Sequence, residues 1–179
     1  MIFYHGTNKK IEMIDLSKCR LRTDFGKGFY LTDKLGTAQG WATRKTLLHG
    51  GTPTVLRYEI NNEIDNLPGK LFERIPSSEW LEFICSNRLN NTKNAPAKEP
   101  RHNHNWVSGP IANDRIADVV DEYLAGEITI DLAIQRARAL PQTYQLSLHT
   151  LDAIRFVDEA NAYYKQFKNN KWTKNWLRR

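Results

Sequence analysis

Short runs of apolar residues, separated by polar and glycine-rich turns, mark the strands that this sequence predicts. Residues 2–4 and 54–60 are rich in β-branched and aromatic side chains, which favours buried strands. Residues 144–149 alternate between apolar and polar side chains, which is the period of a strand with two different faces. Shorter strands are expected at residues 28–32 and 106–108.

Helix signals lie between these strands. Residues 34–49 predict a helix that Thr32 or Asp33 caps and that a pair of glycines ends. Ser77 predicts the cap of a second helix, which has an apolar face. Further helices are expected at residues 113–124, 129–140 and 158–177.

The order of these elements indicates the fold class. Strands separated by irregular helices, without regular β-α-β repetition, favour an α+β fold. The chain of 179 residues is expected to form a single domain over 1–179, with a basic, aromatic helical tail at about 158–179. Residues 90–105 are rich in Asn and are expected to form a long surface loop.

Three segments in the first quarter of the chain suit a flat, cationic ring attached to a ribose. His5 offers an imidazole beside the bare backbone of Gly6. Tyr30 and Trp41 provide two aromatic rings that can enclose a positively charged ring and attract it from both faces. The three segments are Tyr4-His5-Gly6-Thr7, residues 24–32 and residues 38–42.

At these residues the chain resembles the ADP-ribosyltransferase superfamily, in the branch named for its His-Tyr-Glu triad, which includes poly(ADP-ribose) polymerases and diphtheria toxin. The family's His-Gly-Ser/Thr motif is matched by residues 5–7, its Phe-Gly-Lys-Gly-x-Tyr motif by residues 25–30, and its second stacking aromatic by Trp41. The chain is also similar to small bacterial proteins of this fold that carry a later Gly-Pro-x-Ala-Asn-Asp segment, matched by residues 109–114.

The resemblance implies an ADP-ribosyltransferase-like split mixed β-sheet core with surrounding helices, and NAD as a co-substrate. It implies that His5 binds ribose hydroxyls and that the backbone at Gly6 approaches the nicotinamide carboxamide. Tyr30 and Trp41 would stack on the nicotinamide, and Thr7 would either contact the adenosine ribose or cap the chain locally. The implied NAD-binding set is His5, Gly6, Thr7, Gly28, Tyr30 and Trp41.

Two positions depart from the family pattern. The triad glutamate is best matched by Gln145, with His149 on the same strand face as its rival. A glutamine can hold a ribose hydroxyl but cannot act as a general base, so mono-ADP-ribosylation is expected rather than chain elongation. A serine that often binds the carboxamide is replaced by Ala38. Asp114 could supply a carboxylate, although helix capping by Asn113 explains the same residues.

The net charge of +6 lies entirely in residues 160–179. Of 26 basic residues, six lie in residues 160–179, which hold no acid, so the rest of the chain balances at 20 and 20. Basic residues interleaved with aromatics suit nucleic acid, whereas packing of the aromatic residues on the domain or an acidic partner is the structural alternative. The candidate contacts are Lys165, Lys168, Lys171, Trp172, Lys174, Trp176, Arg178 and Arg179.

Other features limit the cellular setting. The sequence has no apolar run long enough to span a membrane and no visible signal peptide, so a cytoplasmic protein is expected. Cys19 and Cys85 are expected to be free thiols in a reducing compartment. Together with His102 and His104 they fit no zinc spacing, so no metal is expected.

The expected function is therefore mono-ADP-ribosyl transfer from NAD to a macromolecule, with nucleic acid, RNA or DNA, slightly favoured over protein as acceptor. By analogy, such an enzyme suits a bacterial toxin or phage-defence effector with an antitoxin partner. The alternatives are an inactive module that binds NAD or ADP-ribose, and an NAD glycohydrolase that uses water as the acceptor. Catalytic roles are expected for His5, Tyr30 and Gln145.

Overall fold

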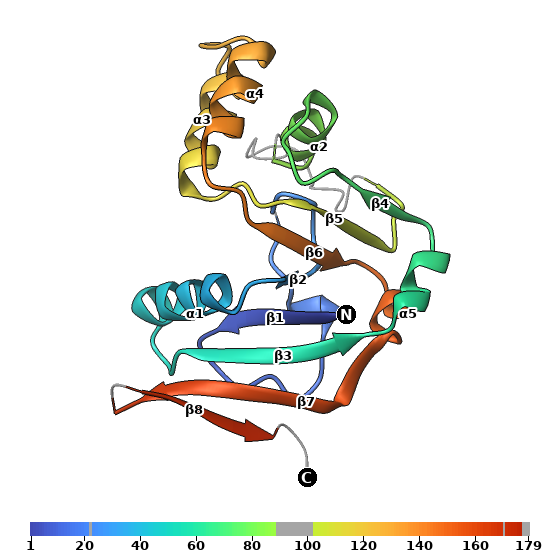
Figure 1. Cartoon of the computed structure of the whole chain (residues 1–179), viewed down its shortest axis with the longest axis vertical. Coiled ribbons are helices and arrows are strands. Elements are labelled where there is room, and N and C mark those ends of the chain that lie inside the picture. The colour runs from blue at the N-terminus through green and yellow to red at the C-terminus, as the bar shows by residue number, and fades with distance from the viewer. Residues whose placement is uncertain (22, 89–101, 170, 177–179) are drawn as a thin grey trace.

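The protein has an α+β architecture built on one mixed sheet of eight strands (Figure 1). A computed structural model describes residues 1–21, 23–88, 102–169 and 171–176. The strand order is β4-β5-β6-β2-β1-β3-β7-β8, and all neighbours are antiparallel except the parallel pair β4 and β5. The strands are β1 (Ile2–Thr7), β2 (Phe29–Thr32), β3 (Thr54–Ile60), β4 (Gly69–Leu71), β5 (Trp106–Pro110), β6 (Tyr144–Leu148), β7 (Val157–Lys168) and β8 (Lys171–Trp176).

The helices divide into two groups. One helix lies against β1, β2 and β3, whereas α2, α3 and α4 gather beside β5 and β6 (Figure 1). The α-helices are α1 (Leu35–His49), α2 (Ser78–Arg88), α3 (Asp114–Leu124), α4 (Ile130–Ala139) and the short α5 (Leu151–Ile154). None of the helices in the described ranges is long and apolar enough to cross a membrane.

The sheet consists of two halves that meet at a narrow junction. Strands β1 and β2 share one pair of facing residues, Tyr4 and Thr32. By contrast, β1 pairs with β3 over six residues and β2 pairs with β6 over four. The junction therefore separates β4-β5-β6-β2 from β1-β3-β7-β8, and it lies at the segments that carry the candidate chemistry.

Two large apolar cores stabilise the described part of the molecule, and the first spans the junction between the sheet halves. The first lies among β1, β2, β3 and β6 and includes Phe3, Phe29, Leu56 and Leu148. The second lies among the three clustered helices and β5 and includes Trp80, Ile84, Val107 and Ile116.

The local signals for helix starts are confirmed for three helices. Ser77 Oγ accepts a hydrogen bond from the Trp80 N–H at 3.2 Å, and Asn113 Oδ1 accepts one from the Ile116 N–H at 3.2 Å. Thr129 caps α4 in the same way. The prediction for α1 was less accurate, because Lys34 occupies the cap position and makes no side-chain cap bond.

The terminal helix predicted at 158–177 is wrong, because these residues form the hairpin of β7 and β8. Strand β7 pairs along the outer edge of β3, which satisfies the backbone groups of that edge, and β8 pairs with β7. Asn169 adopts a left-handed conformation, with φ of 50°, at the turn. The rings of Phe167 and Trp172 face each other across the strands with centroids 5.5 Å apart.

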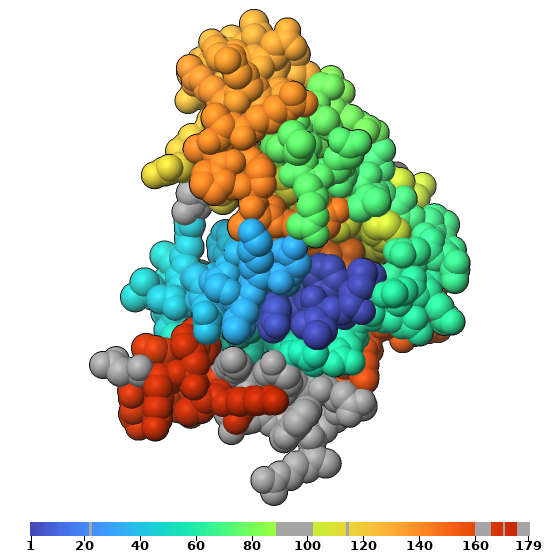
Figure 2. All heavy atoms as spheres, viewed as in Figure 1, coloured from blue at the N-terminus to red at the C-terminus, as the bar shows by residue number. Residues whose placement is uncertain are grey.

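The hairpin also touches α1. Trp172 packs against a small cluster of Ala38, Ala42 and Val55, and the space-filling view shows the red hairpin residues beneath the blue and cyan residues that include α1 (Figure 2). Of the long loop predicted at 90–105, residues 90–101 lie outside the described ranges, and residues 102–105 form neither helix nor strand.

Candidate functional site

The structure brings His5 and Tyr30 together at the junction between the sheet halves. His5 follows the last shared pair on β1, and its Nδ1 lies 2.6 Å from the carbonyl oxygen of Tyr30 on β2. A carbonyl can only accept, so Nδ1 carries the hydrogen and Nε2 keeps its lone pair. The imidazole stacks on Phe29, with ring centroids 4.4 Å apart and an interplanar angle of 21°.

The imidazole of His5 is neutral at physiological pH. Burial and the nearby charge of Lys45 lower the pKa of His5 to about 3, although the hydrogen bond to the Tyr30 carbonyl opposes this shift. A neutral imidazole with Nδ1 committed to the backbone can accept a hydrogen bond from a hydroxyl at Nε2.

The glycine beside His5 has a packing role that the sequence did not reveal. A Cβ built on Gly6 would lie 2.1 Å from the Ala38 carbonyl oxygen and 3.0 Å from the Ala42 nitrogen. Both alanines are fully buried. Gly6 and Ala38 therefore allow the backbone of α1 to rest directly on β1. This close packing also explains why a small residue, Ala38, occupies its position on α1. Thr7 is buried at the end of β1.

Tyr30 uses its hydroxyl inside the protein. The hydroxyl accepts a hydrogen bond from the Phe25 N–H at 2.8 Å and donates one to the Gly26 carbonyl at 2.8 Å. Burial is the main reason that the pKa of Tyr30 is raised well above its usual value. The tyrosine is therefore neutral, and its half-buried ring packs against the second apolar core.

Two histidines hold the carbonyls of the same loop. His102 Nε2 lies 2.8 Å from the Phe25 oxygen, and His149 Nδ1 lies 2.8 Å from the Lys27 oxygen. Burial lowers the pKa of His149 to about 4, so the ring is neutral. Its Nδ1 donates to the Lys27 carbonyl and its Nε2 is left as an acceptor. A Cβ on Gly28 would lie 2.8 Å from the His149 ring, so this glycine makes room for the histidine.

Trp41 lies on α1 next to Ala42 and is 38% exposed. The guanidinium carbon of Arg44 lies 5.5 Å from its ring centroid. Among the described residues, Trp41 makes no ring contact with Tyr30.

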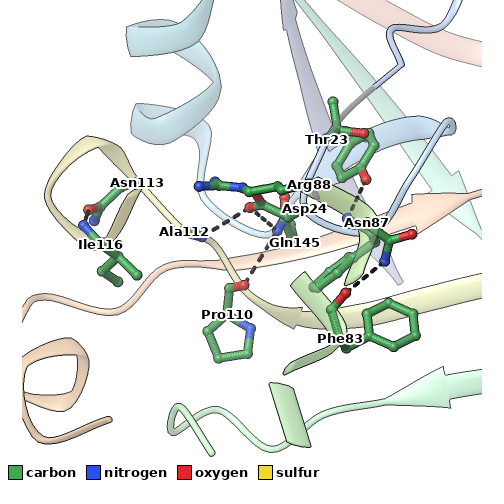
Figure 3. A network of polar contacts seen from close by, with 12 residues as sticks. Thr23, Asp24, Phe83, Asn87, Arg88, Pro110, Ala112, Asn113, Ile116 and Gln145 are labelled. Carbon is green, nitrogen blue, oxygen red and sulfur yellow. Dashed lines mark hydrogen bonds and ion pairs between the residues drawn. The ribbon is translucent and has the colours of Figure 1, made fainter. Parts of the chain in front are cut away.

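Gln145 belongs to a buried polar network that the sequence analysis missed (Figure 3). Its Nε2 donates to Asp24 Oδ2 at 3.0 Å and lies 3.4 Å from the Pro110 carbonyl. Asp24 Oδ2 also accepts from the Ala112 N–H at 3.1 Å, and Oδ1 pairs with Arg88 at 2.6 Å. The network connects the glycine-rich loop to α2, to β6 and to the segment before α3.

This network fixes the orientation of the Gln145 amide. Because Asp24 is an acceptor, the nitrogen must point toward it, which leaves Oε1 as the acceptor end. The only sequence signal for this arrangement was the acid at the start of the glycine-rich segment, and its partners lie 64, 88 and 121 residues further along the chain.

Two other sequence candidates have limited support. Asn113 caps α3, as its alternative reading predicted, and the Asp114 side chain lies outside the described part. Within the described ranges no group of three His, Cys, Asp or Glu side chains could hold a metal ion. The free thiol of Cys85 lies in the core on α2.

Two hollows on the surface lie away from these residues. One of about 400 Å³ is lined by Ser78, Asp131, Ile134, Gln135 and Arg138. The other, of about 530 Å³, is lined by Met1, residues 59–61, Glu63 and residues 155–158. Neither lining includes His5, Tyr30 or Trp41.

Residues 1–158 match the model of a family described as "Protein of unknown function (DUF3990)". The chain belongs to the DUF3990 family. No curated protein and no solved structure matches it. The DUF3990 match includes His5, Asp24, Tyr30 and Gln145. It ends at Asp158, the second residue of β7, so most of the β7-β8 hairpin lies beyond it.

Proposed function

We propose that this DUF3990 protein binds NAD at the junction of β1 and β2 and transfers ADP-ribose to a macromolecule. The observation that carries the proposal is the bond between His5 Nδ1 and the Tyr30 carbonyl, which joins the two motifs and leaves Nε2 as an acceptor, while burial keeps the imidazole neutral. The sheet supports an ADP-ribosyltransferase-like split core, because its halves share a single residue pair at this point.

The chemistry breaks the bond between nicotinamide and C1′ of the ribose and forms a bond from C1′ to the acceptor. Nicotinamide leaves with the bonding electrons, and the acceptor loses its proton to solvent. In this proposal His5 Nε2 accepts a hydrogen bond from a ribose hydroxyl. The rings of Tyr30 and Trp41 flank the nicotinamide. Thr7 and Gly28 line the same NAD site. Fixing the ribose this way favours the oxocarbenium-like transition state.

Gln145 sets the limit of this chemistry. Its nitrogen is committed to Asp24, so the amide offers Oε1 to a ribose hydroxyl and offers no general base. Single transfer to an acceptor that is already nucleophilic is therefore favoured over chain elongation. The same committed amide supports the second candidate, a module that binds NAD or ADP-ribose without turnover, and hydrolysis corresponds to water as the acceptor.

Nucleic acid is the acceptor that the hairpin favours. Lys168 and Lys171 are exposed and directly opposite each other, and Phe167 beside them is 37% exposed. Cations suit phosphates, and an exposed ring suits an unpaired base. We propose the role of a toxin or phage-defence effector restrained by an antitoxin protein, which rests on the family resemblance alone.

The test is incubation of the protein with NAD labelled in its adenylate part and separate pools of cellular RNA, DNA and protein. The proposal predicts label on one pool, with RNA or DNA ahead of protein, and loss of label with His5→Ala. Nicotinamide release without a labelled pool would identify hydrolysis. Saturable NAD or ADP-ribose binding without turnover would identify the binding module, and neither binding nor turnover would refute both candidates.

A further inference from the structure

Two distant histidines hold the glycine-rich loop, residues 24–28, that leads into β2. The carbonyl oxygen of Phe25 lies 2.8 Å from His102 Nε2, and that of Lys27 lies 2.8 Å from His149 Nδ1. The histidines follow these carbonyls by 77 and 122 residues in the chain. Their rings also contact each other edge to face, with centroids 4.6 Å apart and an interplanar angle of 87°. We call the pair His102 and His149 the histidine clamp.

Each ring of the histidine clamp is fixed at both nitrogens. A carbonyl can only accept, so His149 carries its hydrogen on Nδ1 and His102 carries its hydrogen on Nε2. The other nitrogens are acceptors: His149 Nε2 lies 2.8 Å from Ser147 Oγ, and His102 Nδ1 accepts from the His104 N–H at 3.2 Å. The Val107 carbonyl lies 3.2 Å from Ser147 Oγ, so the imidazole is the nearer acceptor for this hydroxyl. The two rings therefore hold the loop in opposite tautomers.

The loop held by the histidine clamp connects parts of the proposed NAD site. It begins at Asp24, which accepts a hydrogen bond from Gln145 at 3.0 Å, and it ends at Gly28, immediately before β2. The Tyr30 hydroxyl bonds to the loop at two backbone groups. The Lys27 carbonyl belongs to the peptide group that leads to Gly28, so a shift of this carbonyl moves Gly28 directly.

We infer that His102 and His149 are positioning residues for the proposed NAD site, which they serve by holding the carbonyls of the glycine-rich loop. This inference rests on the proposed function. It gives His149 a role different from that of a substitute for the triad glutamate, because both of its nitrogens are committed inside the protein. The clamp touches neither NAD nor the acceptor, and it sets where the loop and the start of β2 lie.

Opposite amide substitutions at the two positions test this inference. The side-chain nitrogen of Asn lies as many bonds from the backbone as His Nδ1, and that of Gln lies as many as His Nε2. His149→Asn and His102→Gln therefore keep the donor to the loop carbonyl, whereas His149→Gln and His102→Asn remove it. A role in packing alone favours the larger amide, Gln, at both positions, because Gln leaves the smaller cavity.

Calorimetric titration with NAD gives the first readout. We expect His149→Asn and His102→Gln to bind NAD within about threefold of the wild type. His149→Gln and His102→Asn should bind it at least about tenfold more weakly. The matched controls are the same two substitutions at His49, an exposed residue at the end of α1, and they should change affinity by less than about twofold.

Amide hydrogen exchange of the ligand-free protein gives a second readout, which needs neither NAD nor turnover. The Phe25 N–H is bonded to the Tyr30 hydroxyl and the Gly26 N–H to the Thr23 carbonyl, so both amides report on opening of the loop. The two variants that lose a donor should exchange these hydrogens at least about tenfold faster. The two that keep the donor should exchange them at the wild-type rate, which also shows that they are folded.

The reversed order of Asn and Gln at the two positions, in both readouts, supports the inference. The same order at both positions would overturn it. If the wild type binds NAD and all four variants bind it equally, the positioning role is wrong and the proposed function stands. If exchange shows the reversed order but the wild type binds neither NAD nor ADP-ribose, the clamp holds the loop for another reason and the proposed function fails.

Discussion

At the scale of single residues, the central feature is an imidazole held between two diverging strands. His5 donates from Nδ1 to the Tyr30 carbonyl, and burial keeps the ring neutral. This commitment makes the imidazole a fixed acceptor rather than a proton carrier near neutral pH. In the proposed chemistry, its role is therefore to orient a ribose hydroxyl.

This state of His5 can be measured directly. The pKa of His5 is lowered to about 3, so the ring should be neutral throughout the range from pH 5 to 8, with the hydrogen on Nδ1. Nitrogen-15 NMR of the imidazoles distinguishes the two tautomers and follows titration. A His5 signal that titrates near 6.5, the ordinary value for a histidine, would contradict the buried, neutral arrangement.

Gly6 offers a second test at this scale. In Gly6→Ala the new Cβ would lie 2.1 Å from the Ala38 carbonyl, so α1 would have to move away from β1. We expect a loss of about 2–4 kcal/mol in the free energy of unfolding, measured with denaturant. Gly40→Ala is the control, because nothing lies within 4 Å of that position on α1. It should stabilise the helix by about 0.5–1 kcal/mol, and equal effects of both variants would refute the packing argument.

A substitution at Gln145 that adds a negative charge tests the buried polar network around Asp24. Gln145→Glu replaces the donor beside Asp24 with a second carboxylate, at a contact of 3.0 Å. The pair would then hold a proton at a raised pKa, so stability should be retained at low pH and lost as pH rises through that pKa. We expect a loss of roughly 2 kcal/mol at pH 7, measured by denaturant unfolding.

Two further variants interpret this result. Gln135→Glu adds the same charge on the exposed surface of α4 and should change stability little. Combining Asp24→Asn with Gln145→Glu restores a donor and an acceptor, so it should recover part of the loss. Additive losses in the double variant would show that the two side chains do not act on each other.

At the scale of elements, the sequence correctly predicts those features, such as helix caps, that depend on residues close together in the chain. The caps of α2 and α3 depend on bonds across three residues, and Ser77 and Asn113 make them as expected. The terminal segment was misassigned because its aromatic and basic residues suit either a helix end or a strand. What decides between them is the open edge of β3, which is more than 100 residues away in the chain.

The candidate site shows the same division. The motif around His5 and Tyr30 was visible because the residues are close in sequence and their order is distinctive. The roles of Gly6 and Gly28 were not visible, since each depends on what packs against it, α1 in one case and His149 in the other. The partners of Asp24 were hidden for the same reason.

The hairpin gives a prediction at this scale. Lys168 and Lys171 are directly opposite, and like charges in such a pair repel. Replacing both by Gln should leave stability unchanged or slightly higher, and should weaken binding to single-stranded RNA or DNA. The plot of the logarithm of affinity against the logarithm of salt concentration should become less steep, by the equivalent of about 1–2 phosphate contacts. Fluorescence anisotropy measures this affinity. Unchanged affinity and slope, compared with Lys34→Gln, would remove the hairpin from the acceptor interface.

At the scale of the whole molecule, the proposed site and the excess charge occupy different parts of one fold. The NAD site is proposed at the junction of the sheet halves, within the DUF3990 match, whereas the basic hairpin lies mostly beyond it. The two parts meet where Trp172 packs against Ala38 and Ala42 of α1. A ligand held beside α1 and an acceptor held on the hairpin would therefore be neighbours.

The central claim is that NAD binds at this junction, and calorimetric titration of the protein with NAD tests it most directly. The account predicts one NAD per chain, and binding about tenfold weaker in Trp41→Ala because the exposed ring contributes stacking. Leu47→Ala, which removes an 82% exposed side chain from the same helix, should bind NAD as the wild type does. Absence of NAD binding, or equal affinity in the two variants, would contradict the account.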